Sequence, residues 1–107
     1  MLARPRKQRR SDVNERIKKI HNAIADKLML QPELFEEVEK TLETRYHNKM
    51  MRYGSYLLWK GIIEARHQPD VFKALLLADD ERTAKLRRET LFVGILSEDE
   101  RAAIFAG

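Results

Sequence analysis

The histidines and carboxylates are the first residues to test for catalysis or metal binding. His21, His47 and His67 are far apart, and no His-x-x-x-His pair would place two imidazoles on one helix face around zinc. The chain has no cysteine, which excludes disulfides, thiolate metal sites and cysteine nucleophiles. Its four glycines are isolated, so no glycine-rich phosphate loop is visible. The sequence therefore predicts a protein that is not an enzyme, with no metal site and no cofactor.

Lysine and arginine point to a different chemistry, the neutralisation of phosphate. The chain holds 21 Lys and Arg against 17 Asp and Glu, a formal net charge of +4. Residues 1–10 contain five basic residues and no acidic one, which leaves 16 basic against 17 acidic residues in 11–107. We expect residues 1–10 to form a flexible, disordered arm that can contact nucleic acid. Its basic residues are Arg4, Arg6, Lys7, Arg9 and Arg10.

A second basic group lies between residues 45 and 60, where tyrosines alternate with basic residues and no acidic residue occurs. If this segment is one helix, the spacing places several of these side chains on one face. Basic groups there could contact phosphates while a tyrosine stacks or forms a hydrogen bond. The alternative is that the tyrosines and Trp59 are core residues with their polar tips outward. This candidate surface consists of Arg45, Lys49, Arg52, Tyr53, Tyr56 and Lys60.

A third basic group, Arg82, Lys85 and Arg88, lies in residues 79–90. Together with residues 71–78 this segment is loosely shaped like a helix-turn-helix, whose second helix enters a major groove. The turn lacks glycine, however, and three acidic residues precede Arg82. A solvated helix with internal salt bridges is therefore the favoured interpretation, and its basic residues extend the candidate nucleic-acid surface.

An acidic surface is predicted on the second helix, after Pro32. Acidic side chains repel nucleic acid, but they could bind a basic protein partner or the basic arm. The residues of this alternative, partner-binding surface are Glu33, Glu36, Glu37, Glu39 and Glu43.

The elements that must position these groups are helices. Apolar residues recur at spacings of three and four from Val13 to Leu28, after an Asp12 and Glu15 pair that matches a capping box, which predicts a helix over 12–30. Pro32 ends this helix and suits the first turn of the next. We expect a break near 48–54, because Asn48 and Gly54 are poor helix formers.

A third helix, carrying residues 56–63, should follow that break and stop near 67–70. A short helix over 71–78 and one capped by Asp79 or Asp80 and running to about residue 90 come next. Residues 91–96 are strand-like, and a buried extended segment is an alternative to helix there. Ser97 and Glu100 form a second capping box that opens a final turn. The prediction is an all-α fold, a single small helical bundle of five or six helices in residues 11–107 behind the basic arm.

The function predicted from these patterns is a small regulatory protein that binds nucleic acid, DNA in preference to RNA. The alternative is a protein-protein interaction module, such as an adaptor, an inhibitor or an antitoxin-like protein. Homodimerisation is consistent with both, since Trp59, Phe72, Leu75–Leu77 and Phe105 would allow two copies to bury apolar surface. Neither a signal peptide nor an apolar run of about 20 residues is present, so we expect a cytoplasmic protein with no membrane partner.

Overall fold

The computed structural model describes the backbone of residues 4–106 and the side chains of residues 12–106. The described residues form six α-helices and two short 3-10 helices, with no β-strand among them, which confirms the predicted all-α bundle. The elements are α1 (Arg4–Leu30), η1 (Pro32–Leu34), α2 (Phe35–His47), α3 (Tyr53–Glu64), η2 (Ala65–His67), α4 (Pro69–Leu76), α5 (Glu81–Arg88) and α6 (Glu98–Ala106).

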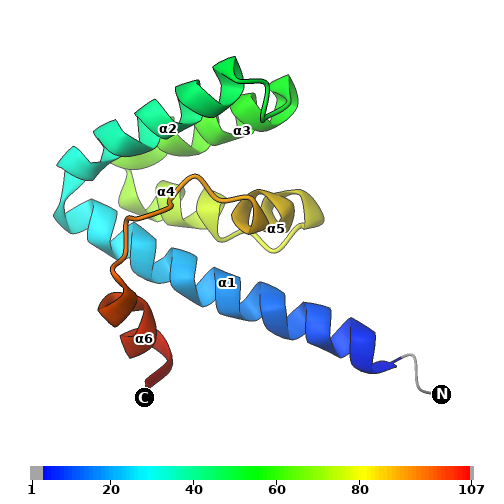
Figure 1. Cartoon of the computed structure of the whole chain (residues 1–107). Helices are drawn as coiled ribbons and strands as arrows, with labels where there is room; N and C mark the ends of the chain where they lie inside the picture. The colour runs from blue at the N-terminus through cyan, green and yellow to red at the C-terminus, as the bar shows by residue number, and fades with distance from the viewer. Residues whose placement is uncertain (1–3, 107) are drawn as a thin grey trace.

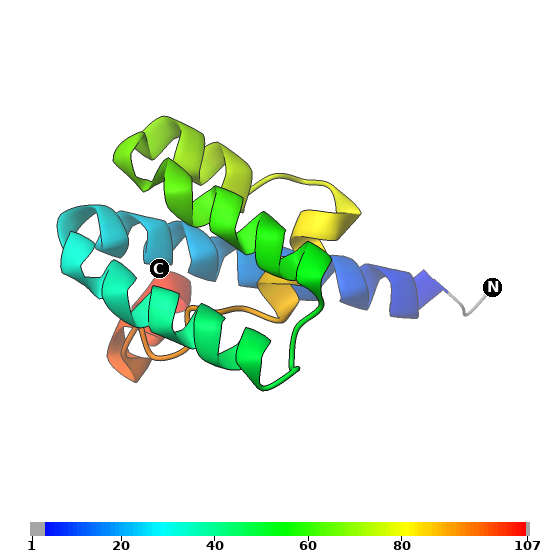
Figure 2. The ribbon, with the colours of Figure 1, turned by 90° about the horizontal axis from the view of Figure 1, so that it is seen from above.

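The long helix α1 is the element against which most of the others pack. It contacts η1, α4, α5 and α6, while α2 packs on α3 (Figure 1). Seen from above, α2 and the α3–α4 pair lie over α1, and the first turns of α1 extend beyond them (Figure 2). An ion pair between Lys73 Nζ and Asp26 Oδ1, at 2.6 Å, links α4 to α1.

Helix α1 begins earlier than predicted. It starts at Arg4, with Pro5 as its second residue, a position where proline costs no helical hydrogen bond. The capping box predicted at Asp12 and Glu15 is therefore wrong, because the helix passes through both residues. The backbone of residues 4–10 is helical, whereas their side chains lie outside the described part of the chain. A functional division into a basic arm and a domain stays a prediction.

The predicted break after the second helix is confirmed and falls at residues 48–52. The Met50 N–H donates to the Arg45 carbonyl at 2.9 Å, and the Lys49 N–H donates to the Tyr46 carbonyl at 3.1 Å. Lys49 has a φ of 60°, so α2 ends in a Schellman motif with lysine in the left-handed position that glycine usually occupies. The chain then turns back at Arg52 into α3.

Helices α4 and α5 are joined by a short connection that is held by hydrogen bonds. The Thr83 N–H donates to Asp80 Oδ1 at 2.7 Å, which confirms Asp80 as the cap of α5. The buried Arg87 side chain donates to the carbonyls of Leu76 and Ala78 at 2.8 and 2.9 Å. Arg87 therefore satisfies carbonyls that the end of α4 leaves without helical partners.

The segment between α5 and α6 forms neither the helix nor the strand considered for residues 91–96. Leu91, Phe92 and Ile95 are buried, so the expectation of a buried segment was right although its regular structure was not. The Ile95 N–H donates to the Phe92 carbonyl at 3.3 Å, and Gly94 has a φ of 81°, as a type II turn requires. The capping box is confirmed, because Ser97 and Glu100 bond each other's backbone N–H at 2.8 and 3.1 Å.

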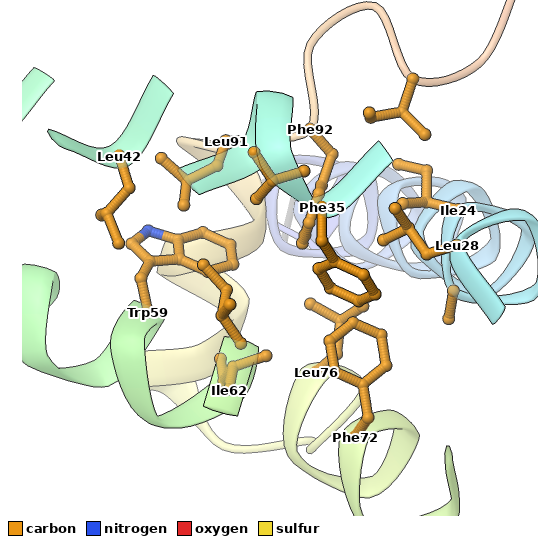
Figure 3. Close-up of a cluster of buried hydrophobic side chains, with 14 of the residues drawn as sticks. Ile24, Leu28, Phe35, Leu42, Trp59, Ile62, Phe72, Leu76, Leu91 and Phe92 are labelled. Carbon is orange, nitrogen blue, oxygen red and sulfur yellow. The ribbon is translucent and has the colours of Figure 1, made fainter. Parts of the chain in front are cut away.

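The core contains one apolar cluster to which five of the six helices and the segment after α5 contribute. Its most deeply buried side chains include Trp59 of α3, Phe72 and Leu76 of α4, Leu28 of α1 and Leu42 of α2 (Figure 3). The ring of Phe92 meets that of Trp59 edge-on at 5.5 Å. Within the described residues no helix is both long and apolar enough to cross a membrane.

Candidate nucleic-acid interface

The turn at 48–52 separates the basic and aromatic residues that one continuous helix would have aligned. The condition for a shared face, one continuous helix, is therefore not met, and Arg45, Lys49, Arg52 and Tyr56 do not lie on one helix face. The half-buried Arg45 donates to the carbonyls of Glu89 and Thr90 at 3.2 and 2.8 Å, which anchors α2 to the end of α5. Lys49 stays exposed at the turn, and Arg52 is the exposed cap of α3.

The tyrosines form a cluster between the end of α2 and the start of α3. The rings of Tyr46 and Tyr56 stack with centroids 4.1 Å apart and planes inclined by 18°. The ring of Tyr53 lies 6.4 Å from that of Tyr56 and 6.1 Å from that of Tyr46. Tyr46 and Tyr56 are half-buried, but Tyr53 is 60% exposed. Trp59 is a core residue, as the alternative interpretation expected.

Tyr56 and Lys60 are engaged within the chain. The Tyr56 hydroxyl donates to Glu43 Oε2 at 2.8 Å, and Lys60 Nζ lies 3.7 Å from the same carboxylate oxygen. The hydrogen bond to Glu43 raises the pKa of Tyr56. A hydrogen bond between the Lys60 and Tyr56 side chains raises the pKa of Lys60. Both side chains thus hold α2 against α3, so binding a ligand through either would require exchanging an existing contact.

A groove between α3 and α5 brings together basic residues that are far apart in the sequence. Its volume is about 1010 Å³, and Arg52 lines it from the start of α3, opposite basic side chains from α5. Gly54, Ser55, Leu57, Leu58 and Leu86 supply the rest of the lining, with Glu81 as the one acidic residue among the residues lining it. The α5 residues are Arg82, Lys85 and Arg88.

A second hollow, of about 460 Å³, lies beside this groove and shares Arg52, Ser55 and Lys85 with it. Among the ion pairs of residues 12–106, none involves Arg52, Arg82 or Lys85. These three exposed charges are therefore available to an anionic ligand. We call the α3–α5 groove, with the adjoining hollow, the basic groove.

The basic groove lies at the same end of the molecule as the start of α1. Arg88 donates to Asn14 Oδ1 of α1 at 3.0 Å, which ties α5 to α1 ten residues after Arg4. The α2–α3 turn, α5 and the first turns of α1 lie toward one end in both ribbon views (Figures 1 and 2). The predicted contact residues Arg4, Arg6, Lys7, Arg9 and Arg10 precede this point, with side chains outside the described part of the chain.

Most of the predicted acidic surface lies at the opposite end, where α1 ends and α2 begins, whereas Glu43 lies beside the tyrosine cluster (Figure 1). Part of its charge is paired, since Glu39 Oε1 accepts from Arg66 at 2.7 Å and Glu43 contacts Tyr56 and Lys60. A groove of about 560 Å³ lies there, with Leu28, Met29 and Phe35 among its apolar residues. Its acidic residues are Glu33, Glu36 and Glu39, and Arg66 and His67 also line it; we call it the acidic groove.

The residues of the basic groove that sequence reasoning missed are Gly54, Ser55, Leu57, Leu58, Glu81 and Leu86 in the α3–α5 groove, and Met50, Met51, Trp59 and Glu89 in the adjoining hollow. No periodic or motif signal could have identified them, because they meet only through the packing of α3 near α5. No group of three or more His, Cys, Asp or Glu suited to a metal ion occurs among the described residues. In comparisons with known proteins, no family model, no curated protein and no solved structure matches this chain.

Proposed function

We propose that this chain is a nucleic-acid-binding protein without catalytic activity, acting on DNA in preference to RNA. The observation that carries the proposal is the basic groove, in which Arg52 from α3 faces Arg82, Lys85 and Arg88 from α5. Positive charges gathered from separate helices can neutralise several neighbouring phosphates of one strand.

The N-terminal basic residues extend this contact. Five basic residues lie in residues 1–10, and the backbone of α1 carries those from Arg4 onward past the basic groove. Each phosphate that they neutralise adds to the affinity and to its dependence on salt. Binding would be dominated by phosphate contacts, so we expect little dependence on base sequence.

The test is a salt titration of binding to a labelled duplex and a labelled single strand, followed by fluorescence anisotropy. Arg52→Glu with Lys85→Glu removes two exposed groove charges, and we expect the slope of log affinity against log salt to fall by about 2. Lys19→Glu with Lys40→Glu is the matched control, because both lysines are exposed and neither lines the basic groove. Equal affinity and slope for these two variants would exclude the groove as the binding site.

A second variant tests the N-terminal residues in the full chain. Replacing Arg4, Arg6, Lys7, Arg9 and Arg10 with glutamine keeps good helix formers in α1 while removing the charge. The slope should fall by about 0.9 for each duplex phosphate that these residues neutralise. An unchanged slope would remove residues 1–10 from the proposal.

The acidic groove favours a second candidate function, a protein-interaction module that binds a basic segment. Its apolar residues, with Glu33, Glu36 and Glu39, suit a peptide that combines Lys or Arg with an apolar anchor. This candidate predicts no retention on either nucleic acid at moderate salt, so the same titration separates the two functions.

A further inference from the structure

Tyr53 is an aromatic residue held in place but left open to solvent. It is the first residue of α3, and its ring lies beside those of Tyr56 and Tyr46, with centroids 6.4 and 6.1 Å away. Those two rings stack on each other, and the Tyr56 hydroxyl is fixed by Glu43. The outermost ring of this cluster is thus supported from behind while 60% of the residue stays accessible. A supported ring loses little conformational freedom when another ring packs on it.

The surroundings of Tyr53 are basic and apolar. The adjacent turn presents the exposed Lys49 and Met50, and Arg52 directly precedes Tyr53. The nearest carboxylate of the cluster, Glu43, already contacts Tyr56 and Lys60. A ring with cationic neighbours is the combination that binds nucleotides, since the cations attract phosphate while the ring receives a base.

The position of Tyr53 connects it with the basic groove. Leu57 lies four residues further along α3 and therefore on the same side of the helix as Tyr53. Leu57 lines the basic groove, and so do Arg52 and Gly54 on either side of Tyr53. The exposed ring thus lies on α3 next to residues that line the basic groove, although Tyr53 itself is not among the lining residues.

We propose that the nucleic acid is single-stranded at this position, and that an unpaired base stacks on Tyr53 while the basic groove holds the flanking phosphates. This inference rests on the proposed function. In a duplex the base faces are covered by neighbouring bases, so Tyr53 can gain a stacking contact only from an unpaired base. Every base has an aromatic face, so the contact favours single strands without selecting a sequence.

Other aromatic residues of this region cannot take this role as they stand. Trp59 is buried in the core, and Tyr46 and Tyr56 are half-buried and stacked on each other. Of the three tyrosines and Trp59, only Tyr53 is exposed.

The experiment compares Tyr53→Leu with Tyr53→Phe on single-stranded oligothymidylate and on a duplex of equal length, about 15 nucleotides. Leucine keeps the apolar bulk without the aromatic face, whereas phenylalanine keeps the face. We expect Tyr53→Leu to weaken single-strand binding by about 5- to 150-fold and Tyr53→Phe to leave it within about twofold. Duplex affinity should change by less than about twofold in both variants. Oligouridylate in place of oligothymidylate should give the same pattern.

A direct readout of stacking is available from Tyr53→Trp. Its indole should be quenched when oligothymidylate binds, whereas the buried Trp59 of the unmodified chain should change little. Absence of quenching, or equal losses for Tyr53→Leu on single strand and duplex, would overturn the inference. A Leu variant as active as the Phe variant would instead indicate an apolar contact, as in a protein interface.

Failure of this inference is distinguishable from failure of the proposed function. If Arg52→Glu with Lys85→Glu abolishes binding while Tyr53→Leu does not, the basic groove stands and only the stacking contact is lost. If the unmodified chain binds neither probe, the proposed function fails first.

Discussion

Among the side chains of residues 12–106, His21 is the most buried ionisable group. Its Nδ1 lies 2.8 Å from the Ile17 carbonyl and its Nε2 lies 2.8 Å from Thr90 Oγ1. A carbonyl can only accept, so Nδ1 carries the proton and Nε2 accepts from the Thr90 hydroxyl. The same hydroxyl oxygen accepts from the Phe92 N–H at 3.1 Å. Neutral His21 therefore fastens the segment after α5 to α1.

This arrangement makes stability depend on pH. Burial lowers the pKa of His21 from 6.5 to about 4, and Arg87 contributes in the same direction. Between these two pKa values, His21 is protonated in the unfolded chain and neutral in the folded chain. The free energy of unfolding therefore falls as the pH drops from about 6.5 to about 4. The loss amounts to on the order of 3 kcal/mol, which urea unfolding across this range would measure.

His21→Gln should remove the pH-dependent contribution of His21 to the free energy of unfolding. The difference in unfolding free energy between the unmodified chain and the variant should therefore narrow steadily as the pH falls. His47→Gln, at an exposed position, is the control for exchanging a histidine for glutamine. A gap that stays constant over the range would contradict the assignment of a neutral, buried His21.

At the level of single residues, the sequence indicated which charges exist but not which are available. Arg45 and Arg52 lie in the same basic run, yet Arg45 bonds two backbone carbonyls while Arg52 faces a groove. Arg87 and Arg88 are adjacent, yet Arg87 is buried against the end of α4. The distinction depends on which carbonyls the packed helices leave unsatisfied, and that is decided only in the folded chain.

At the level of elements, the helix ends that were predicted correctly carry side-chain caps or proline. Asp80 and Ser97 were found because a cap is a local contact over three residues, and Pro32 because proline restricts its neighbour. The end of α2 was placed only approximately, since its left-handed residue is Lys49 where glycine would be the usual signal. The start of α1 was missed because a capping sequence does not have to begin a helix.

Replacing Gly61 or Gly94 with alanine should change the stability in opposite directions. Gly61 lies inside α3, and a Cβ added there would meet nothing within 4 Å. Gly61→Ala should therefore stabilise the protein by roughly 0.4–1 kcal/mol, since it removes conformational freedom from the unfolded chain without a clash. The measurement is the midpoint and slope of urea unfolding.

Gly94 is the matched comparison, because a Cβ there is equally free of contacts but the residue has a φ of 81°. Gly94→Ala should destabilise the protein by about 1 kcal/mol or more, since alanine is strained in this conformation. If Gly61→Ala destabilised the chain, some close approach to that face of α3 would have to be assumed.

At the level of the whole molecule, the fold class followed from helical periodicity, whereas the binding surface did not. Arg52 and Lys85 are separated by more than thirty residues and meet only because α3 and α5 border one groove. The folded chain also separates its two grooves: the basic groove is lined from α3 and α5, and the acidic groove from the end of α1 and the start of α2. Neither property can be read from local spacing.

The contact between Arg88 and Asn14 also sets a length scale for the nucleic acid. Arg4 lies ten residues before Asn14 on α1, a distance of about 15 Å along the helix axis. An oligonucleotide just long enough to fill the groove would therefore fail to reach the start of α1. The unmodified chain and the variant with five glutamines should bind it equally, and their affinities should separate only as the oligonucleotide is lengthened.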